Sequence, residues 1–103
     1  MKIILNTDKN ILGDERLESY LSALIEEELS HFSEHITRIE IHLADENGPK
    51  NGQNDKKCTL EARIEGRKPI AVTCHENSVE QAVNEALEKL KAMLETIDGK
   101  VKG

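Results

Sequence analysis

Three stretches of alternating apolar and polar residues lie between two stretches with helical periodicity, and this order allows few folds. The alternating stretches are Thr37–Leu43, Lys57–Glu65 and Arg67–Cys74. Each predicts a β-strand with one buried and one exposed face, because successive side chains of a strand point to opposite sides. A short apolar run, Lys2–Asn6, predicts another strand before the first helical stretch.

The helical stretches are Asp14–Phe32 and Ser78–Ile97, in which apolar residues recur at spacings of three and four. Ser78 and Gln81 have the spacing of a capping box, which marks the start of the second helix. Gly99 is expected to end that helix, because glycine is favoured just beyond a helix end.

The predicted element order is therefore β-α-β-β-β-α. Hairpins can join the last three strands antiparallel, whereas the first helix must cross over and leave the first strand parallel to the second. One face of the sheet is polar, so both helices must cover the other face. We expect an α+β two-layer sandwich, a four-stranded mixed sheet with two helices on one face. It forms one domain over residues 1–99, with residues 100–103 as a flexible tail.

The turn between the third and fourth strands sets which residues face each other. A two-residue turn would place polar residues beside apolar ones on one face, so we expect a three-residue loop. A loop at Glu65–Arg67 would pair Cys58 with Cys74. A loop at Gly66–Lys68 would instead pair Leu60 with Cys74. Both registers keep the cysteines on the buried face, and the pattern leaves both open.

No catalytic, metal or cofactor site is predicted. His31 and His35 have a spacing that can bind a metal from one helix face, but no third ligand is evident. The segment Asp45–Asp55 has the composition of a flexible loop and begins like a calcium loop, but Pro49 and Lys50 interrupt the ligand pattern. No glycine-rich phosphate loop is present. We therefore expect a protein that is not an enzyme.

The two cysteines, Cys58 and Cys74, are interpreted as reduced, buried and chemically inert side chains. A redox switch between them is the alternative, in the register that pairs them. The N-terminus has no signal-peptide pattern, and no apolar run is long enough to span a membrane. The expected location is the cytoplasm, with no membrane partner.

The charge balance argues against a generic nucleic-acid-binding protein, because 20 Asp and Glu oppose 14 Lys and Arg to give a net charge of -6. The aromatic residues Tyr20 and Phe32 both lie in the first helical stretch, so no base-stacking platform is expected. The charge is uneven, however: acid dominates residues 14–46 and base dominates residues 56–68. This pattern fits either a solvated surface with local ion pairs or a basic patch that contacts phosphates.

Four segments together resemble one known family, the ribosome hibernation promoting factors (also called the S30AE or sigma-54 modulation protein family). They are Ile36–Leu43, Asp45–Gly48, Glu61–Val72 and Gln81–Leu90. The resemblance extends over nearly the whole chain, and the family has the β-α-β-β-β-α order. The chain resembles the short members, which lack the C-terminal dimerisation domain of long ones.

The resemblance implies a bacterial cytoplasmic protein that binds the small ribosomal subunit and its 16S rRNA in stationary phase or stress. Family members occupy the channel for messenger and transfer RNA, and so inhibit translation by steric occupancy without chemistry. Lys89 matches a basic position of the family's RNA-facing surface, and the matching hairpin segment adds further basic residues. The predicted RNA-binding residues are Arg63, Arg67, Lys68, Lys89 and Lys91.

The first helix suggests a second hypothesis. Glu26, Glu27 and Glu28 stand where typical family members have lysine or arginine. Since like charge opposes contact with phosphate, this acidic helix could instead bind a basic protein partner. The chain would then be a protein-interaction regulator.

Overall fold

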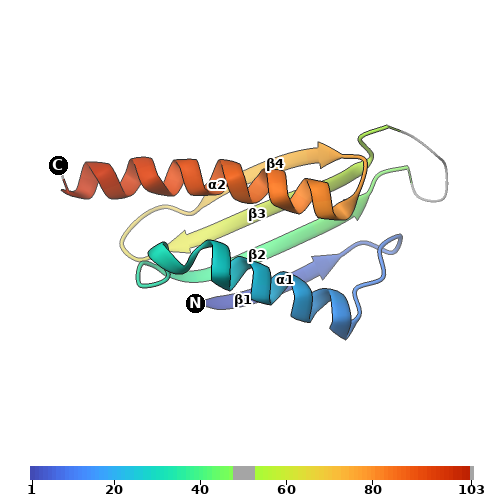
Figure 1. Ribbon diagram of the computed structural model, residues 1–103, viewed down its shortest axis with the longest axis horizontal. Coiled ribbons are helices and arrows are strands. Elements are labelled where there is room, and N and C mark those ends of the chain that lie inside the picture. The colour runs from blue at the N-terminus through green and yellow to red at the C-terminus, as the bar shows by residue number, and fades with distance from the viewer. Residues whose placement is uncertain (48–52, 103) are drawn as a thin grey trace.

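The computed structural model describes residues 1–47 and 53–102, and from residue 98 onward it describes the backbone alone. The elements follow the predicted order β-α-β-β-β-α, with one added 3₁₀ turn (Figure 1). They are β1 (Lys2–Thr7), α1 (Glu15–Glu28), η1 (Ser30–Phe32), β2 (Ile36–Asp45), β3 (Lys56–Ile64), β4 (Ile70–Glu76) and α2 (Val79–Lys102).

The four strands form one mixed sheet in the order β1-β2-β3-β4. β1 is parallel to β2, because α1 crosses over between them, and the other neighbours are antiparallel. Both helices lie on the same face of this sheet, as Figure 1 shows, so the predicted two-layer α+β sandwich is confirmed. The other face has no covering element within the described residues.

The β3–β4 hairpin has the register that pairs Cys58 with Cys74 and Ala62 with Ile70. This is the first of the two predicted alternatives, with a loop at Glu65–Arg67. Gly66 has a φ of 74°, a left-handed conformation that glycine adopts without steric cost. The Arg67 N–H closes the turn by donating to the carbonyl oxygen of Ile64 at 3.1 Å.

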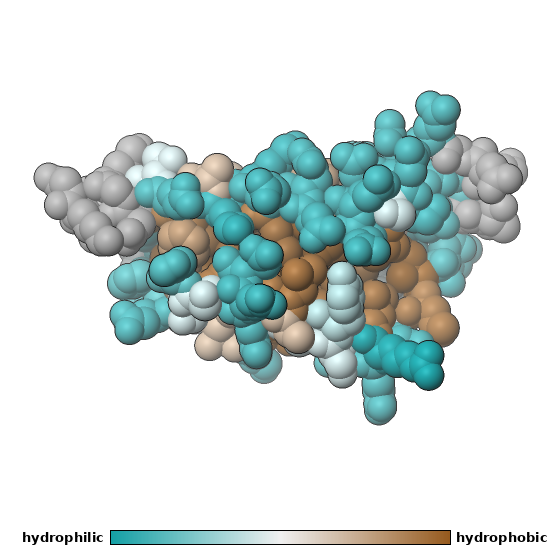
Figure 2. Space-filling model, in the orientation of Figure 1, coloured by the Kyte–Doolittle hydropathy of each residue, from teal (hydrophilic) through white to brown (hydrophobic). Residues whose placement is uncertain are grey.

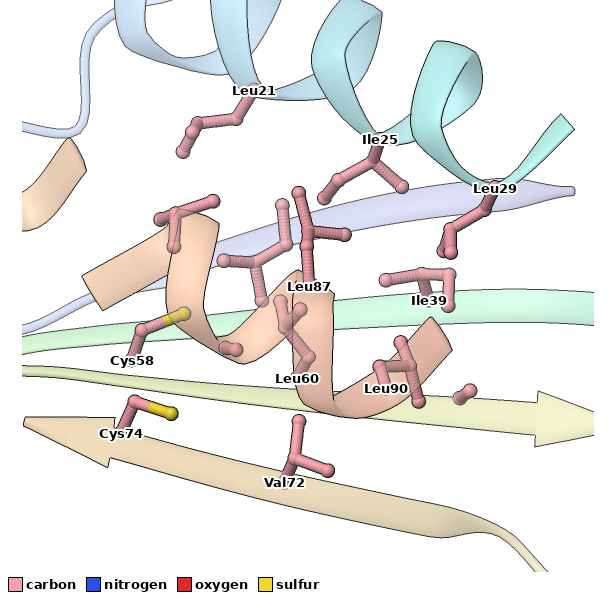
Figure 3. Packing of buried hydrophobic residues seen from close by; sticks show 14 of the residues in the cluster. Leu21, Ile25, Leu29, Ile39, Cys58, Leu60, Val72, Cys74, Leu87 and Leu90 are labelled. Carbon is pink, nitrogen blue, oxygen red and sulfur yellow. The ribbon is translucent and has the colours of Figure 1, made fainter. Parts of the chain in front are cut away.

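The hydrophobic core fills the space between the sheet and the two helices (Figure 3). Leu21 and Ile25 of α1, with Leu29 just after it, point toward the sheet and are almost completely buried. Cys58 and Cys74 lie side by side as free thiols, on the buried face that the alternation predicted. Burial, reinforced by the neighbouring thiol, raises the pKa of Cys58 to about 12, so it is a protonated apolar side chain at neutral pH.

The first helix is shorter than predicted. The Asp14 side chain caps its start by accepting from the Leu17 N–H at 3.0 Å, as expected for an N-cap aspartate. The α-helix ends at Glu28, however, and Ser30–Phe32 form a 3₁₀ turn. The buried Leu29 is the C-cap and accepts from the Phe32 N–H at 2.9 Å. This tighter turn leads the chain down to β2, which the periodicity of the apolar residues could not indicate.

The second helix is longer than predicted. Ser78 caps it by accepting from the Gln81 N–H at 3.1 Å. The prediction that Gly99 ends the helix was wrong, because α2 continues to Lys102. A glycine inside a helix costs only about 1 kcal/mol, so without a following turn it does not stop the helix.

Most strand ends also differ from the prediction, by one to three residues. β4 begins at Ile70 rather than at Arg67, because the three residues before it complete the turn and Pro69 has no N–H to donate to a ladder. β2 extends to Asp45. The middle of the predicted flexible loop, residues 48–52, lies outside the described residues. The Glu46 N–H donates to the Asp55 carbonyl oxygen at 2.9 Å, which joins the two ends of this segment.

Candidate nucleic-acid interface

The helix layer, by which we mean α1 and the part of α2 up to Ile97, is strongly acidic. α1 has five glutamates and one basic residue, Arg16. In α2 four glutamates accompany Lys89 and Lys91 up to that point. Figure 2, which views this layer, shows hydrophilic side chains along both helices and a hydrophobic strip between them. A phosphate backbone approaching this layer would therefore meet mostly like charge.

The uncovered side of the sheet, here called the open sheet face, has the opposite balance. Since side chains alternate along each strand, the residues between the buried ones point to this face. Its charged residues are the bases Lys2, Arg38, Lys57 and Arg63 and the acids Glu40 and Glu61. No Phe, Tyr or Trp is among the strand residues, so this face lacks the large aromatic rings of a base-stacking platform.

Three of the bases form one row across the sheet, here called the basic row. Lys2 pairs with Arg38 across β1 and β2, and Arg38 pairs with Arg63 across β2 and β3. Neighbouring strands are about 4.8 Å apart, so the three side chains project close together from the open sheet face. The row lies at the end of the sheet where β3 turns into β4.

The hairpin tip adds two more bases beside this row. Arg67 and Lys68 follow the end of β3, and both are exposed. Neither forms an ion pair within the described part of the chain. The basic row and the hairpin tip therefore lie at the same end of the molecule.

The carboxylate of Glu40 lies next to the basic row and holds two of its arginines. Its Oε2 atom is 3.0 Å from Arg38 Nη2 and 3.8 Å from Arg63 Nε. Arg63 Nε is also 3.3 Å from Oε1 of Glu61. The Glu40 side chain is only 19% exposed, whereas that of Arg63 is 48% exposed. The carboxylate therefore lies below the guanidinium, which remains accessible from solvent.

Farther along the same face, beyond Glu40 and Glu61, most side chains are polar. The hydroxyls of Thr59 and Thr73 are 2.9 Å apart across β3 and β4. His42 belongs to the same row, and its Nε2 atom is 3.8 Å from Oε1 of Glu40. In the next row, His75 Nε2 is 2.8 Å from Oε1 of Glu46. These groups can donate hydrogen bonds to phosphate or to ribose hydroxyls.

The structure divides the predicted RNA-binding residues between two surfaces. Arg63, Arg67 and Lys68 lie together at the hairpin end, but Lys89 and Lys91 lie on α2 in the helix layer. The five residues do not converge on one patch. Their role in binding RNA stays a prediction.

Lys91 has an intramolecular partner. Its Nζ is 2.8 Å from Glu28 Oε2, and this ion pair links α2 to α1. The hydrogen bond and the negative charge of Glu28 raise the pKa of Lys91. A lysine engaged in this way is a weaker candidate for phosphate than the exposed Lys89.

Sequence reasoning missed two members of the basic surface, Lys2 and Arg38. Arg38 was placed on the outward face by its alternation, but only the parallel register of β1 and β2 aligns Lys2 with it. A pattern of charges along the chain contains no information on this register.

A groove of about 550 Å³ lies between the C-terminal end of α1, the 3₁₀ turn and α2. Its lining includes Glu27, Glu95 and His31, together with the Lys91–Glu28 pair. Across residues 1–47 and 53–97, no group of three or more His, Cys, Asp and Glu side chains is placed to hold a metal ion. None of the helices, as far as the structure describes them, is long and apolar enough to cross a membrane.

A second charged cluster lies at the opposite end of the sheet. Lys56 Nζ is 3.0 Å from Asp55 Oδ1 and 3.3 Å from Asp45 Oδ2. Its hydrogen bond lowers the pKa of Asp55, and the same contact raises the pKa of Lys56. Because the charges are paired, this cluster fixes the two ends of residues 46–55 rather than offering free charge.

Comparison with solved structures shows the same fold. A ribosomal subunit interface protein from Coxiella burnetii superposes with a TM-score of 0.72 at 15% identity, covering 96% of this chain and 99% of that one. The N-terminal domain of Protein Y from Thermus thermophilus gives a TM-score of 0.73 at 11% identity, covering 94% of this chain and 99% of that one.

The two sequence comparisons gave different results. No curated protein matches the chain in sequence. Residues 5–102 match the family described as Sigma 54 modulation protein / S30EA ribosomal protein. This match begins within β1 and includes the other three strands and both helices, so the earlier resemblance is confirmed: the chain belongs to the Sigma 54 modulation protein / S30EA ribosomal protein family.

Proposed function

We propose that this protein is a cytoplasmic ribosome-associated inhibitor of translation that binds the small ribosomal subunit. The observation that supports this most is the family match over residues 5–102, to a family that includes ribosomal proteins. The two solved structures of like fold, a ribosomal subunit interface protein and a Protein Y domain, agree with it in their names.

The proposed inhibition is steric. The protein would occupy the path of messenger and transfer RNA during stress, and it would need no catalytic group. Basic side chains would contact phosphates of 16S rRNA, and the candidates are either Arg63, Arg67 and Lys68 at the hairpin end or Lys89 and Lys91 on α2. Such contacts release counterions, so binding should weaken steeply as salt increases.

Co-sedimentation with purified small ribosomal subunits tests the proposal. At low salt the protein should pellet with the subunits, and at high salt it should remain in the supernatant. Addition of the protein to a cell-free translation reaction should lower protein synthesis in proportion to subunit occupancy. Failure to pellet even at low salt would overturn the proposal.

The acidic helix layer favours a second candidate function, docking on a basic protein. Nine glutamates against three basic residues give this layer a strongly negative potential. A pull-down from lysate treated with nuclease separates the two functions. Loss of ribosomal proteins after nuclease supports the first, whereas retention of one basic partner supports the second.

A further inference from the structure

We infer that this protein meets RNA with the basic row and hairpin tip of the open sheet face, and that the helix layer faces away from the RNA. The inference rests on the proposed function and adds which surface makes contact. The partner it fits is the phosphate backbone of folded RNA.

Charge complementarity is the first argument. The basic row and hairpin tip bring five bases together, Lys2, Arg38, Arg63, Arg67 and Lys68. The acids nearest to them are Glu40, Glu61 and Glu65. Base thus exceeds acid on this surface, whereas acid exceeds base threefold in the helix layer.

The ion pairs of the basic row do not cancel this advantage. Ion pairs in contact with solvent contribute little to stability, so phosphates can compete with them. The side chains of Glu40 and Glu61 are less exposed, at 19% and 31%, than that of Arg63 at 48%. An approaching phosphate therefore meets the guanidinium first, and the carboxylates below it fix its position.

The chemistry of the remaining face indicates how RNA would be recognised. Thr59, Thr73 and His42 form a polar row four residues farther along β2 and β3 than the basic row. Hydroxyls and imidazole can bond to ribose hydroxyls and phosphates, and the strands contain no Phe, Tyr or Trp for stacking. Recognition would follow RNA shape and backbone rather than base sequence.

Two double variants with the same change in net charge test the inference. The hairpin variant is Arg67→Glu with Lys68→Glu, and the helix-layer variant is Arg16→Glu with Lys89→Glu. All four side chains are exposed, so both proteins should fold, which a circular dichroism melt would verify. The probe is the purified small ribosomal subunit, and the dissociation constant is measured at several salt concentrations.

We expect the hairpin variant to bind at least about tenfold more weakly, with a salt slope reduced by roughly 2, because two phosphate contacts are lost. The helix-layer variant should keep the wild-type slope and lose much less affinity. Equal or greater loss in the helix-layer variant would overturn the inference while leaving the proposed function intact. Absence of wild-type binding at low salt would overturn the proposed function, and the inference with it.

Discussion

The helix layer and the open sheet face cover the same sheet from opposite sides, yet they differ in charge and in what they bury. The helices bury apolar stripes against the sheet and turn a surface rich in glutamate to solvent. The open sheet face buries nothing further and arranges bases in a row. The net charge of -6 averages these two surfaces. Net charge alone is therefore a poor guide to nucleic-acid binding in a layered fold.

The largest effect is expected where the helix layer joins the sheet. Ile25 of α1 is completely buried, so Ile25→Ala should lower the free energy of unfolding by about 2–5 kcal/mol. Urea denaturation measures this change. Ala23→Ser on the exposed side of the same helix is the control and should stay within about 0.5 kcal/mol of wild type. Equal changes in the free energy of unfolding for the two variants would show that Ile25 does not anchor α1 to the core.

The next effect concerns pH and the core below the open sheet face. The folded-state pKa of Cys58 is raised to about 12 from an ordinary value of 9.0, so folding favours the protonated thiol. The contribution of this protonated thiol to the free energy of unfolding is fully present below pH 9 and is lost as pH rises from about 9 to 12. The free energy of unfolding should decline by up to about 1.4 kcal/mol per pH unit there.

Cys58→Ala tests this origin, since the variant should show a shallower alkaline decline in urea denaturation. Cys74→Ala, which keeps Cys58 in the core, is the matched control. If Cys58→Ala shows the same alkaline decline in the free energy of unfolding as the wild type, other groups cause that decline. At neutral pH both thiols of the wild-type protein should react slowly with a thiol reagent until the protein is unfolded.

A smaller effect is expected from the acidic surface itself. If the helix layer faces away from RNA, Glu26→Gln with Glu27→Gln changes only the long-range potential, which salt screens within about 10 Å. The affinity for small ribosomal subunits should rise by less than about threefold at physiological salt. A large gain, measured by the same binding titration, would indicate that these glutamates face phosphate.

The smallest effect is expected for the ion pair that links the two helices. Lys91→Met removes the ion pair with Glu28, and both side chains of this pair are partly exposed. The melting temperature should fall less than in Ile25→Ala, and subunit binding should hardly change. A loss of binding comparable to that of the hairpin variant would make Lys91 an RNA contact and would place the helix layer against RNA.

The fold was largely predictable because the burial pattern alternates so regularly. Residues such as Ile39, Ile41 and Leu60 occupy the buried face that the alternation assigned to them. The element ends were less predictable. The 3₁₀ turn after Leu29 and the passage of α2 through Gly99 depend on packing and on the path of the chain.

The candidate site was predictable in part. Arg63, Arg67 and Lys68 adjoin one another in sequence, so they also do so in space. Lys89 and Lys91 were grouped with them by charge and by resemblance, but they lie in the other layer. Lys2 joins the site only through strand register, which no local pattern specifies.

Lysine footprinting on the ribosome tests the division between the two surfaces most directly. The complex with small ribosomal subunits and the free protein would be acetylated in parallel, and each lysine would be quantified by mass spectrometry. We predict that Lys2 and Lys68 become protected in the complex while Lys89 stays as reactive as in the free protein. Protection of Lys89 with Lys2 and Lys68 still reactive would contradict the assignment of RNA contact to the open sheet face.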